Sequence, residues 1–145
     1  MEKTLCIIKP DGVRRGLVGE VLRRVERAEF RIRGLRMLRL KMEEAERLYD
    51  VHRGKPFFED LLKFMTQGLI VVALLEKENG ISDLRGMVGE TDPSLAKLGT
   101  IRGDLGGTKR ENVVHASDSP FRAKKEIALF FSEVFRDDGT RGVLG

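Results

Sequence analysis

LIVVALL, from Leu69 to Leu75, is the longest uninterrupted apolar run in the chain and the segment that decides its fold. The run is short, rich in branched side chains and preceded by Gly68, a combination typical of a β-strand that is buried on both faces. It is far shorter than the roughly 20 residues that cross a bilayer, so we expect no membrane segment. The sequence therefore predicts a central strand that other elements cover on two sides.

Strand-like and helix-like segments alternate on both sides of this run. Further strands are predicted at Thr4–Ile8, Ile32–Leu40 and Val113–His115. Helices are predicted at Val18–Val25, Glu43–Tyr49, Phe57–Thr66 and Gly80–Val88, and a last one opens at Ser119-Pro120. Residues outside the apolar stripe of the first helix are expected mostly to face solvent: Arg23, Arg24 and Arg27. The alternation predicts an α/β sandwich with helices on a small sheet, and it leaves the strand order open.

Glycine and proline mark the breaks between these segments. After the first strand, Pro10 and Asp11-Gly12 are predicted to turn the chain. Gly54 and Pro56 interrupt two helical segments, which predicts a helical hairpin. The stretch 89–112 contains five glycines and little periodicity. Loops of this length are often functional, so this stretch is a candidate part of a site.

The composition favours one domain in a reducing compartment. The chain has 145 residues and 41% hydrophobic content, enough for one core over residues 1–135, whereas 136–145 lack an apolar pattern and are predicted to fray. A net charge of +4 suits anionic ligands. Cys6 lies inside an apolar run, so we expect a buried, inert thiol. Because no secretion signal follows Met1, we expect a cytoplasmic location.

The candidate chemistry is concentrated in NVVHASDS, from Asn112 to Ser119. One ring nitrogen of His115 could attack phosphorus near neutral pH while a carboxylate, such as that of Glu126, orients the other. The start of the helix at Ser119-Pro120 would attract phosphate through its free N–H groups. Local features alone leave open a packed or surface histidine, and a surface ion pair between Glu126 and Arg122.

NVVHASDS resembles the signature of the nucleoside diphosphate kinase family and agrees with it everywhere except at Ala116, where glycine is usual. Five further blocks resemble the family and follow in its order: IKPDGV (8–13), RGLVGE (15–20), KPFF (55–58), GETDP (89–93) and GTIRGD (99–104). Agreement in several separated blocks is hard to obtain by chance. The resemblance covers nearly the whole chain.

This resemblance implies both a fold and a reaction. The fold is a ferredoxin-like α+β sandwich, in which helices cover a four-stranded antiparallel sheet and a helical hairpin accompanies a long active-site loop. The reaction is ping-pong transfer of the γ-phosphate from a nucleoside triphosphate to a nucleoside diphosphate through a phosphohistidine at His115. Lys9, Glu126 and Ser117 match the residues that assist this histidine. The residues that match the family's nucleotide ligands are Lys9, Tyr49, Phe57, Arg85, Thr91, Arg102 and Asn112.

The resemblance also implies a ligand, a metal and an assembly. Phe57 would stack on the base, with Val51 or a neighbour completing an apolar slot, so purines and pyrimidines should both be accepted. Mg²⁺ would be bound mainly through the nucleotide phosphates, and we name no protein ligand for it. The protein is expected to form a homo-oligomer, with a hexamer favoured and a tetramer possible.

Some positions depart from the family pattern, and the sequence disfavours two other functions. Ala116 requires a backbone with negative φ or a modest strain, and Leu98 and Gly106-Gly107 leave the order of the long loop open. A nucleic-acid-binding module is disfavoured because the chain lacks an aromatic-rich RNA-binding strand and mixes its basic residues with acidic ones. A catalytically silent interaction protein on the same fold is disfavoured because Lys9, Arg102, His115 and Glu126 are all intact. His52 is expected to be an exposed residue near a helix end.

Overall fold

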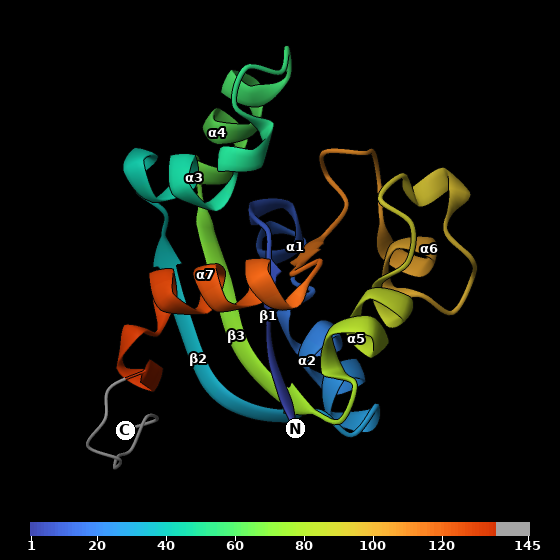
Figure 1. The fold of residues 1–145 in the computed structure, drawn as a ribbon. Coiled ribbons are helices and arrows are strands. Elements are labelled where there is room, and N and C mark those ends of the chain that lie inside the picture. Colours follow the sequence, from blue (N-terminus) through green and yellow to red (C-terminus); the bar gives the residue numbers. More distant parts are fainter. Residues whose placement is uncertain (136–145) are drawn as a thin grey trace.

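Four antiparallel strands form the centre of the protein, whose computed structural model describes residues 1–135. The strands are β1 (Glu2–Ile8), β2 (Arg31–Arg39), β3 (Leu69–Lys77) and β4 (Val114–Ala116), and they lie in the order β2-β3-β1-β4 (Figure 1). This order and the antiparallel pairing confirm the predicted ferredoxin-like sheet. The frayed tail predicted at 136–145 lies outside the described residues.

The LIVVALL run lies in β3, which has a neighbouring strand on each side. Residues 70–76 are all buried, and Val72 lies opposite Ile7 of β1. Successive side chains of a strand point to opposite faces, so Val72 packs in one core and Val71 in the other. The prediction of a strand buried on both faces is confirmed.

Helices cover both faces of this sheet. One face packs against α3 (Met42–Leu48), α4 (Phe58–Thr66) and α7 (Pro120–Phe130), and α7 crosses the sheet in Figure 1. The other face packs against α2 (Val18–Arg27), α5 (Gly80–Val88) and α6 (Ile101–Leu105). The last described element is the 3-10 turn η3 (Ser132–Phe135). Within residues 1–135, the helices are too short or too polar to cross a membrane.

The predicted helical hairpin stands at one end of the sheet (Figure 1). Its first helix, α3, leads into the 3-10 turn η1 (Asp50–His52), and the chain returns along α4. Gly54 makes the turn between them with a φ of +88°, a conformation that costs glycine little. The loop that follows α6 rises toward the same end of the sheet in Figure 1, so the two segments can share one site.

Two segments that were predicted to be irregular contain short helices. Pro10–Arg14 forms the helix α1 in place of the predicted turn, and 89–112 contains η2 (Pro93–Leu95) as well as α6. In α6, Oγ1 of Thr100 caps the helix by accepting a hydrogen bond from the backbone N–H of Gly103 at 3.0 Å. These helices are too short for an apolar period to be visible in the sequence, which is why the prediction was wrong there.

Arg24 also departs from its predicted role as a solvent-facing residue. It is half-buried and forms ion pairs with Glu20 at 2.7 Å and with Asp104 at 2.9 Å. Asp104 belongs to α6, so this guanidinium ties α2 to the long segment. The apolar stripe on α2 shows which side of this helix packs on the sheet. It does not show that α6 contacts another side of the same helix.

Candidate active site

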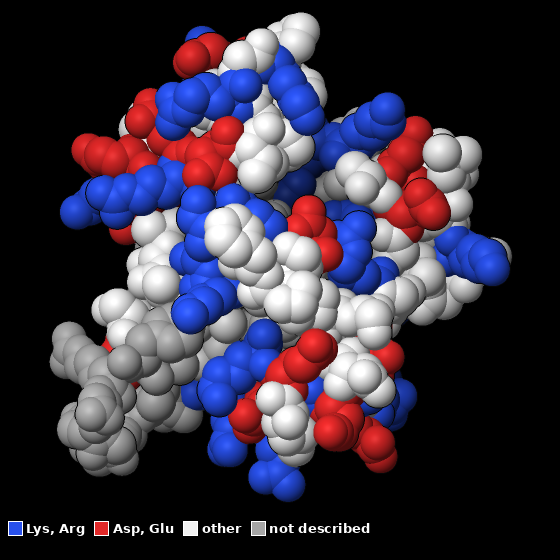
Figure 2. Space-filling view, in the orientation of Figure 1, with Lys and Arg blue, Asp and Glu red and all other residues white. Residues whose placement is uncertain are grey.

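A cavity of about 540 Å³ opens between the hairpin and the long segment, at the end of the sheet where β4 carries His115. In Figure 2, blue Lys and Arg side chains surround a hollow in this region. The cavity wall contains all the residues predicted as nucleotide ligands: Lys9, Tyr49, Phe57, Arg85, Thr91, Arg102 and Asn112. It also contains His115 and Glu126, whereas Ser117 lies behind the wall and is fully buried.

Basic side chains outnumber acidic ones around this cavity. Its lysines and arginines are Lys9, Arg85, Arg102, Lys109, Arg110 and Arg122, and its carboxylates are Asp118 and Glu126. A cleft lined mainly by one sign of charge focuses the electrostatic field and concentrates ligands of the opposite sign. The cavity therefore suits an anionic ligand that carries several phosphate charges.

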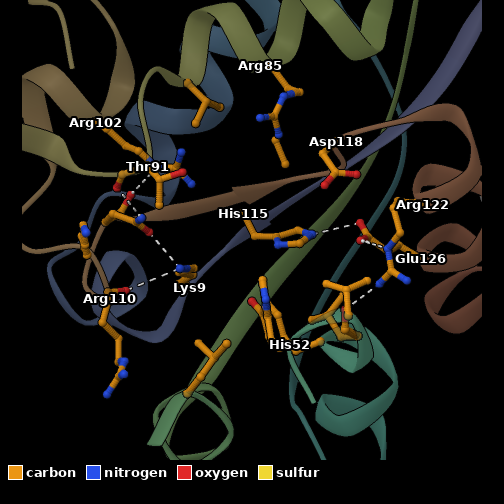
Figure 3. A pocket seen from close by; sticks show the side chains of 18 of the residues that line it. Lys9, His52, Arg85, Thr91, Arg102, Arg110, His115, Asp118, Arg122 and Glu126 are labelled. Atoms are coloured by element: carbon orange, nitrogen blue, oxygen red, sulfur yellow. Dashed lines mark hydrogen bonds and ion pairs between the residues drawn. The ribbon is translucent and has the colours of Figure 1, made fainter. Parts of the chain in front are cut away.

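His115 is held at the cavity by a strand and by a carboxylate. Its backbone lies opposite Ile7 of β1, and its Nε2 is 2.9 Å from Oε1 of Glu126 (Figure 3). A carboxylate can only accept a hydrogen bond, so Nε2 carries the hydrogen and Nδ1 keeps a free lone pair. Oγ of Ser117 donates to the same Oε1 at 2.7 Å. The structure thus brings these three predicted residues together.

Glu126 interacts with Arg122 as well as with His115, but both Glu126 and Arg122 are buried, so the alternative of a surface ion pair is wrong. Its Oε2 lies 3.6 Å from Nε of Arg122. Burial raises the pKa of this carboxyl, but the interactions with His115, Ser117 and Arg122 outweigh burial and hold the pKa below its usual range. Glu126 is therefore an ionised acceptor at neutral pH.

A strained backbone turn comes two residues before His115. Val113 has a φ of +75°, which is unusual for a β-branched residue. The backbone N–H of Val114 donates to the carbonyl of Asn112 at 2.9 Å, which closes a three-residue γ-turn around Val113. Such a turn persists only where its surroundings hold it in place.

Two groups from the corner between β1 and α1 hold this turn. Oδ2 of the buried Asp11 accepts a hydrogen bond from the N–H of Val113 at 3.0 Å, and the N–H of Lys9 donates to the Val113 carbonyl at 2.8 Å. Ala116, by contrast, has no positive φ. The strained backbone that Ala116 could have required is therefore found at Val113 instead.

Lys9 lies almost completely buried beneath the cavity. Its Nζ donates to Oδ1 of Asn112 at 2.8 Å, and Nδ2 of Asn112 donates to the carbonyl of Thr91 at 2.9 Å. Burial, reinforced by the charge of Arg102, lowers the pKa of Lys9 to about 7. Asn112 thus joins the floor of the cavity to the long segment.

Backbone carbonyls hold the guanidinium of Arg102 in place. NH1 donates to the carbonyl of Gly89 at 3.0 Å, and NH2 donates to the carbonyl of Val114 at 2.7 Å. Burial and the nearby charge of Arg85 lower the pKa of Arg102 to about 10. The group is therefore still charged at neutral pH, and it reaches the cavity from a fixed position.

The hairpin contributes the aromatic and apolar part of the wall. The ring of Tyr49 is 5% exposed and meets the imidazole of His115 edge-on, with 5.6 Å between the ring centroids. Phe57 is 40% exposed, so part of its ring is accessible to a ligand. Val51 and Leu61 also line the cavity and can complete an apolar slot beside it.

His52 has a different environment from the exposed one that we predicted. It is half-buried, lines the cavity and lies between two aromatic rings, with centroids 6.3 Å from Tyr49 and 5.2 Å from Phe57. Burial, together with the charge of Lys55, lowers its pKa. Its spacing of three residues from Tyr49 could have suggested a shared face, but the short 3-10 turn between them gave no periodic signal.

Four charged residues of the wall were not predicted as site residues: Lys109, Arg110, Asp118 and Arg122. Lys109 and Arg110 lie in the loop that precedes Asn112, where the sequence shows no regular period. Asp118 lies within the NVVHASDS block, so its place in the signature was the available signal. Arg122 was considered only as a surface partner of Glu126.

Comparison with known proteins gives the family directly. The sequence profile described as nucleoside diphosphate kinase matches residues 2–135 of the chain. The chain belongs to this family. The resemblance proposed from the sequence motifs is therefore confirmed.

Close relatives and solved structures agree with this assignment. A nucleoside diphosphate kinase of Staphylothermus marinus is 54% identical over 132 residues, which cover 91% of this chain and 94% of that protein. The nucleoside diphosphate kinase of Aquifex aeolicus has a TM-score of 0.89 at 41% identity, covering 92% of this chain and 96% of that one. That of Halobacterium salinarum, solved in complex with CDP, has a TM-score of 0.89 at 37% identity, covering 97% and 93%. These likenesses confirm the predicted fold.

Proposed function

We propose that this enzyme is a nucleoside diphosphate kinase that transfers the γ-phosphate of a nucleoside triphosphate to a nucleoside diphosphate through a phosphohistidine at His115. The observation that carries the proposal is the 2.9 Å contact between Nε2 of His115 and Glu126 at the wall of a basic cavity. It leaves Nδ1 as the nucleophile. Membership of the family supports ping-pong kinetics, in which the donor product leaves before the acceptor binds.

Each half of the proposed reaction exchanges one bond to phosphorus for another. The lone pair of Nδ1 attacks the γ-phosphorus while the bond to the β,γ-bridging oxygen breaks, and that oxygen leaves on the nucleoside diphosphate. The hydrogen on Nε2 stays with the ring and remains bonded to Glu126, which stabilises the positive charge that develops on the imidazole. The second half-reaction reverses these steps on another nucleoside diphosphate, whose terminal oxygen attacks phosphorus and returns the lone pair to Nδ1.

The remaining wall residues would bind the nucleotide. Ammonium, guanidinium and hydroxyl groups donate hydrogen bonds to phosphate oxygens and neutralise their charge during transfer. These groups belong to Lys9, Tyr49, Arg85, Thr91 and Arg102. Asn112 would contact the ribose, together with Lys9. Ser117 would act from behind, through its hydrogen bond to Glu126.

Phe57 would hold the base by stacking. A ring face does not read the hydrogen-bonding edge of a base, and the neighbouring Val51 and Leu61 are apolar. This environment supports tolerance of purines and pyrimidines alike. The enzyme should therefore use many nucleotides at comparable rates.

Mg²⁺ would enter with the nucleotide and neutralise charge on its phosphate oxygens. Within residues 1–135 there is no group of three or more His, Cys, Asp or Glu side chains that could hold a metal ion. Of the two carboxylates in the wall, Glu126 is already bonded to His115, so Asp118 would be the one available to the ion or its water. This donor set fits a metal held mainly by phosphate and water.

The proposed homo-oligomeric state rests on membership of the family, and the proposed cytoplasmic location is supported by the state of the single cysteine. Cys6 is buried, and burial raises its pKa to about 12, which is compatible with an unreactive thiol in a reducing compartment. A hexamer is favoured over a tetramer, and a solution mass equal to that of one chain, 16.4 kDa, would reject both.

Steady-state kinetics test the proposed function. Initial rates at several fixed concentrations of a nucleoside diphosphate, with the triphosphate varied, should give parallel lines in a double-reciprocal plot and should require a divalent metal. Purine and pyrimidine nucleotides should both serve. Intersecting lines would mean that donor and acceptor are bound together, which contradicts a phosphoenzyme.

A further inference from the structure

The guanidinium of Arg122 joins the helical hairpin to the carboxylate that holds His115. It lies on the cavity wall, yet Arg122 is only 9% exposed (Figure 3). NH1 donates to Oδ1 of Asp50 at 2.9 Å, and NH2 donates to the carbonyl of Leu48 at 2.8 Å. Nε lies 3.6 Å from Oε2 of Glu126. The rigid, planar group therefore has a different partner at each of its three nitrogens.

On one side, these contacts fix the connection that carries Tyr49 and His52 to the cavity. Leu48 is the last residue of α3, and Asp50 is the first residue of η1, so the two bonds flank Tyr49. Lys125 adds a contact from α7 to Oδ2 of Asp50 at 3.2 Å. The wall that would face the nucleotide is thus tied to α7 by hydrogen bonds and charge.

On the other side, Arg122 contacts the second carboxylate oxygen of Glu126. His115 and Ser117 both bond to Oε1, whereas Oε2 faces Arg122. Interactions at both oxygens set the orientation of the carboxylate, and that orientation in turn sets the plane of the imidazole. An ordinary i,i+4 surface pair would not do this, because its side chains are solvated and mobile. Arg122 is nearly buried, and two of its contacts leave its own helix.

We propose that Arg122 is a positioning residue that couples the nucleotide-binding hairpin to the imidazole of His115. The inference rests on the proposed function, because it concerns the alignment of Nδ1 with the phosphorus of a bound nucleotide. Catalysis of in-line phosphoryl transfer consists almost entirely of positioning and electrostatic stabilisation, so it depends strongly on this alignment. The contacts with Asp50 and Leu48 then govern nucleotide capture, and the contact with Glu126 governs the rate of transfer.

The test measures phosphorylation of the enzyme by γ-labelled ATP and Mg²⁺, without acceptor, in a rapid-quench instrument. The ATP dependence gives a half-saturating concentration and a limiting rate. Asp50→Asn weakens only the hairpin side, so it should raise the half-saturating concentration about tenfold and leave the limiting rate within about twofold. Arg122→Met removes both sides, so it should also lower the limiting rate by about tenfold or more.

Two further variants separate positioning from charge and from general destabilisation. Lys124→Met removes a cation from the exposed side of the same helix and should behave as the wild type. Arg122→Lys keeps the charge without the planar fork. In Arg122→Met, the acid side of the pH profile of the limiting rate should move to higher pH, because the Glu126 carboxylate loses a neighbouring cation that lowers its pKa and therefore protonates more readily. In Arg122→Lys, the acid side of the pH profile of the limiting rate should lie close to that of the wild type. The half-saturating ATP concentration should remain high.

The outcomes distinguish the two proposals. A wild-type protein that takes no label would refute the proposed function. If the wild type is labelled and Arg122→Met matches it in rate, half-saturation and pH profile, the inference about Arg122 is overturned and the proposed function stands. If Arg122→Met fails to fold, the milder variants Asp50→Asn and Arg122→Lys test the inference about Arg122. Wild-type values in both of these would likewise overturn the inference.

Discussion

Nζ of Lys9 donates a 2.8 Å hydrogen bond to Oδ1 of Asn112, so a buried ammonium group faces a neutral amide at the floor of a basic cavity. Burial and the charges of Arg102 and Arg110 disfavour the proton, and Asp11 offsets this only in part, which leaves the pKa of Lys9 at about 7. A bound phosphate would supply the missing negative charge and raise this pKa. Nucleotide binding and protonation of Lys9 should therefore be linked.

The first prediction is that nucleotide binding takes up a proton at about pH 8.5, where Lys9 is largely neutral in the empty site and the phosphates are fully ionised. Titration calorimetry in buffers of different ionisation enthalpy measures this uptake. Lys9→Met should bind more weakly and take up no proton. Equal uptake by the variant would place the linked group elsewhere.

The same burial predicts how the stability of the empty protein depends on pH. Between about pH 7 and the ordinary lysine pKa of about 10.4, the unfolded chain binds a proton at Lys9 that the folded protein does not. The free energy of unfolding should therefore rise with pH over this window, relative to Lys9→Met. Below about pH 7 both states are protonated, so the difference between wild type and variant should become constant. Urea unfolding at a series of pH values measures the free energy of unfolding of both proteins. If the difference between them does not change with pH, the pKa of Lys9 is not lowered.

The strained turn at Val113 leads to a prediction about Asp11. Asp11→Ala removes the acceptor for the Val113 N–H, so it should destabilise the fold by about 1–3 kcal/mol, the cost of an unpaired buried donor. It should also slow phosphorylation, because the turn positions the strand that carries His115. Asp11→Asn keeps an oxygen at this place and should lose less of both. Equal losses in stability and rate for the two variants would argue against this role.

The order of the long segment depends on Gly103, which follows Arg102 in α6. A Cβ at Gly103 would lie 1.9 Å from the carbonyl oxygen of Lys97, so Gly103→Ala must displace the backbone. We expect a loss of about 1–3 kcal/mol in stability and a higher half-saturating nucleotide concentration. Gly86 lies in α5 with nothing within 4 Å of its Cβ position. Gly86→Ala should be neutral or stabilising by up to about 1 kcal/mol, and a larger loss there than at Gly103 would refute this account.

Those parts of the fold and site that rest on local patterns could be predicted from the sequence. The buried run Leu69–Leu75 predicted β3, because burial on two faces removes polar residues from the whole strand. Most of the predicted site residues lie in short blocks that match the family, whereas Tyr49, Arg85 and Glu126 lie outside these blocks and were predicted from the resemblance over the whole chain. His115 and Asn112, for example, belong to one block.

Features that depend on contacts between distant segments could not be predicted in this way. Arg122 meets Asp50, which is 72 residues away in the sequence, and no spacing on α7 reveals that contact. Arg24 is paired through α6, a helix too short to show a period. The strain at Val113 depends on Asp11, which lies 102 residues before it. Each of these contacts exists only after the sheet has assembled.

The most direct test of the central claim is covalent labelling of His115. Incubation with a γ-labelled nucleoside triphosphate and Mg²⁺, without acceptor, should leave label on the protein. Because a phosphoramidate nitrogen is readily protonated, this label should survive an alkaline quench, be lost in acid, and transfer to any added nucleoside diphosphate.

The matched variant for this measurement is His115→Gln, which keeps a planar polar side chain and removes the nucleophilic nitrogen. Labelling and transfer should both fall by roughly three orders of magnitude or more, with little change in folding. Stable labelling of His115→Gln, or a folded wild-type protein that takes up no label, would contradict the account.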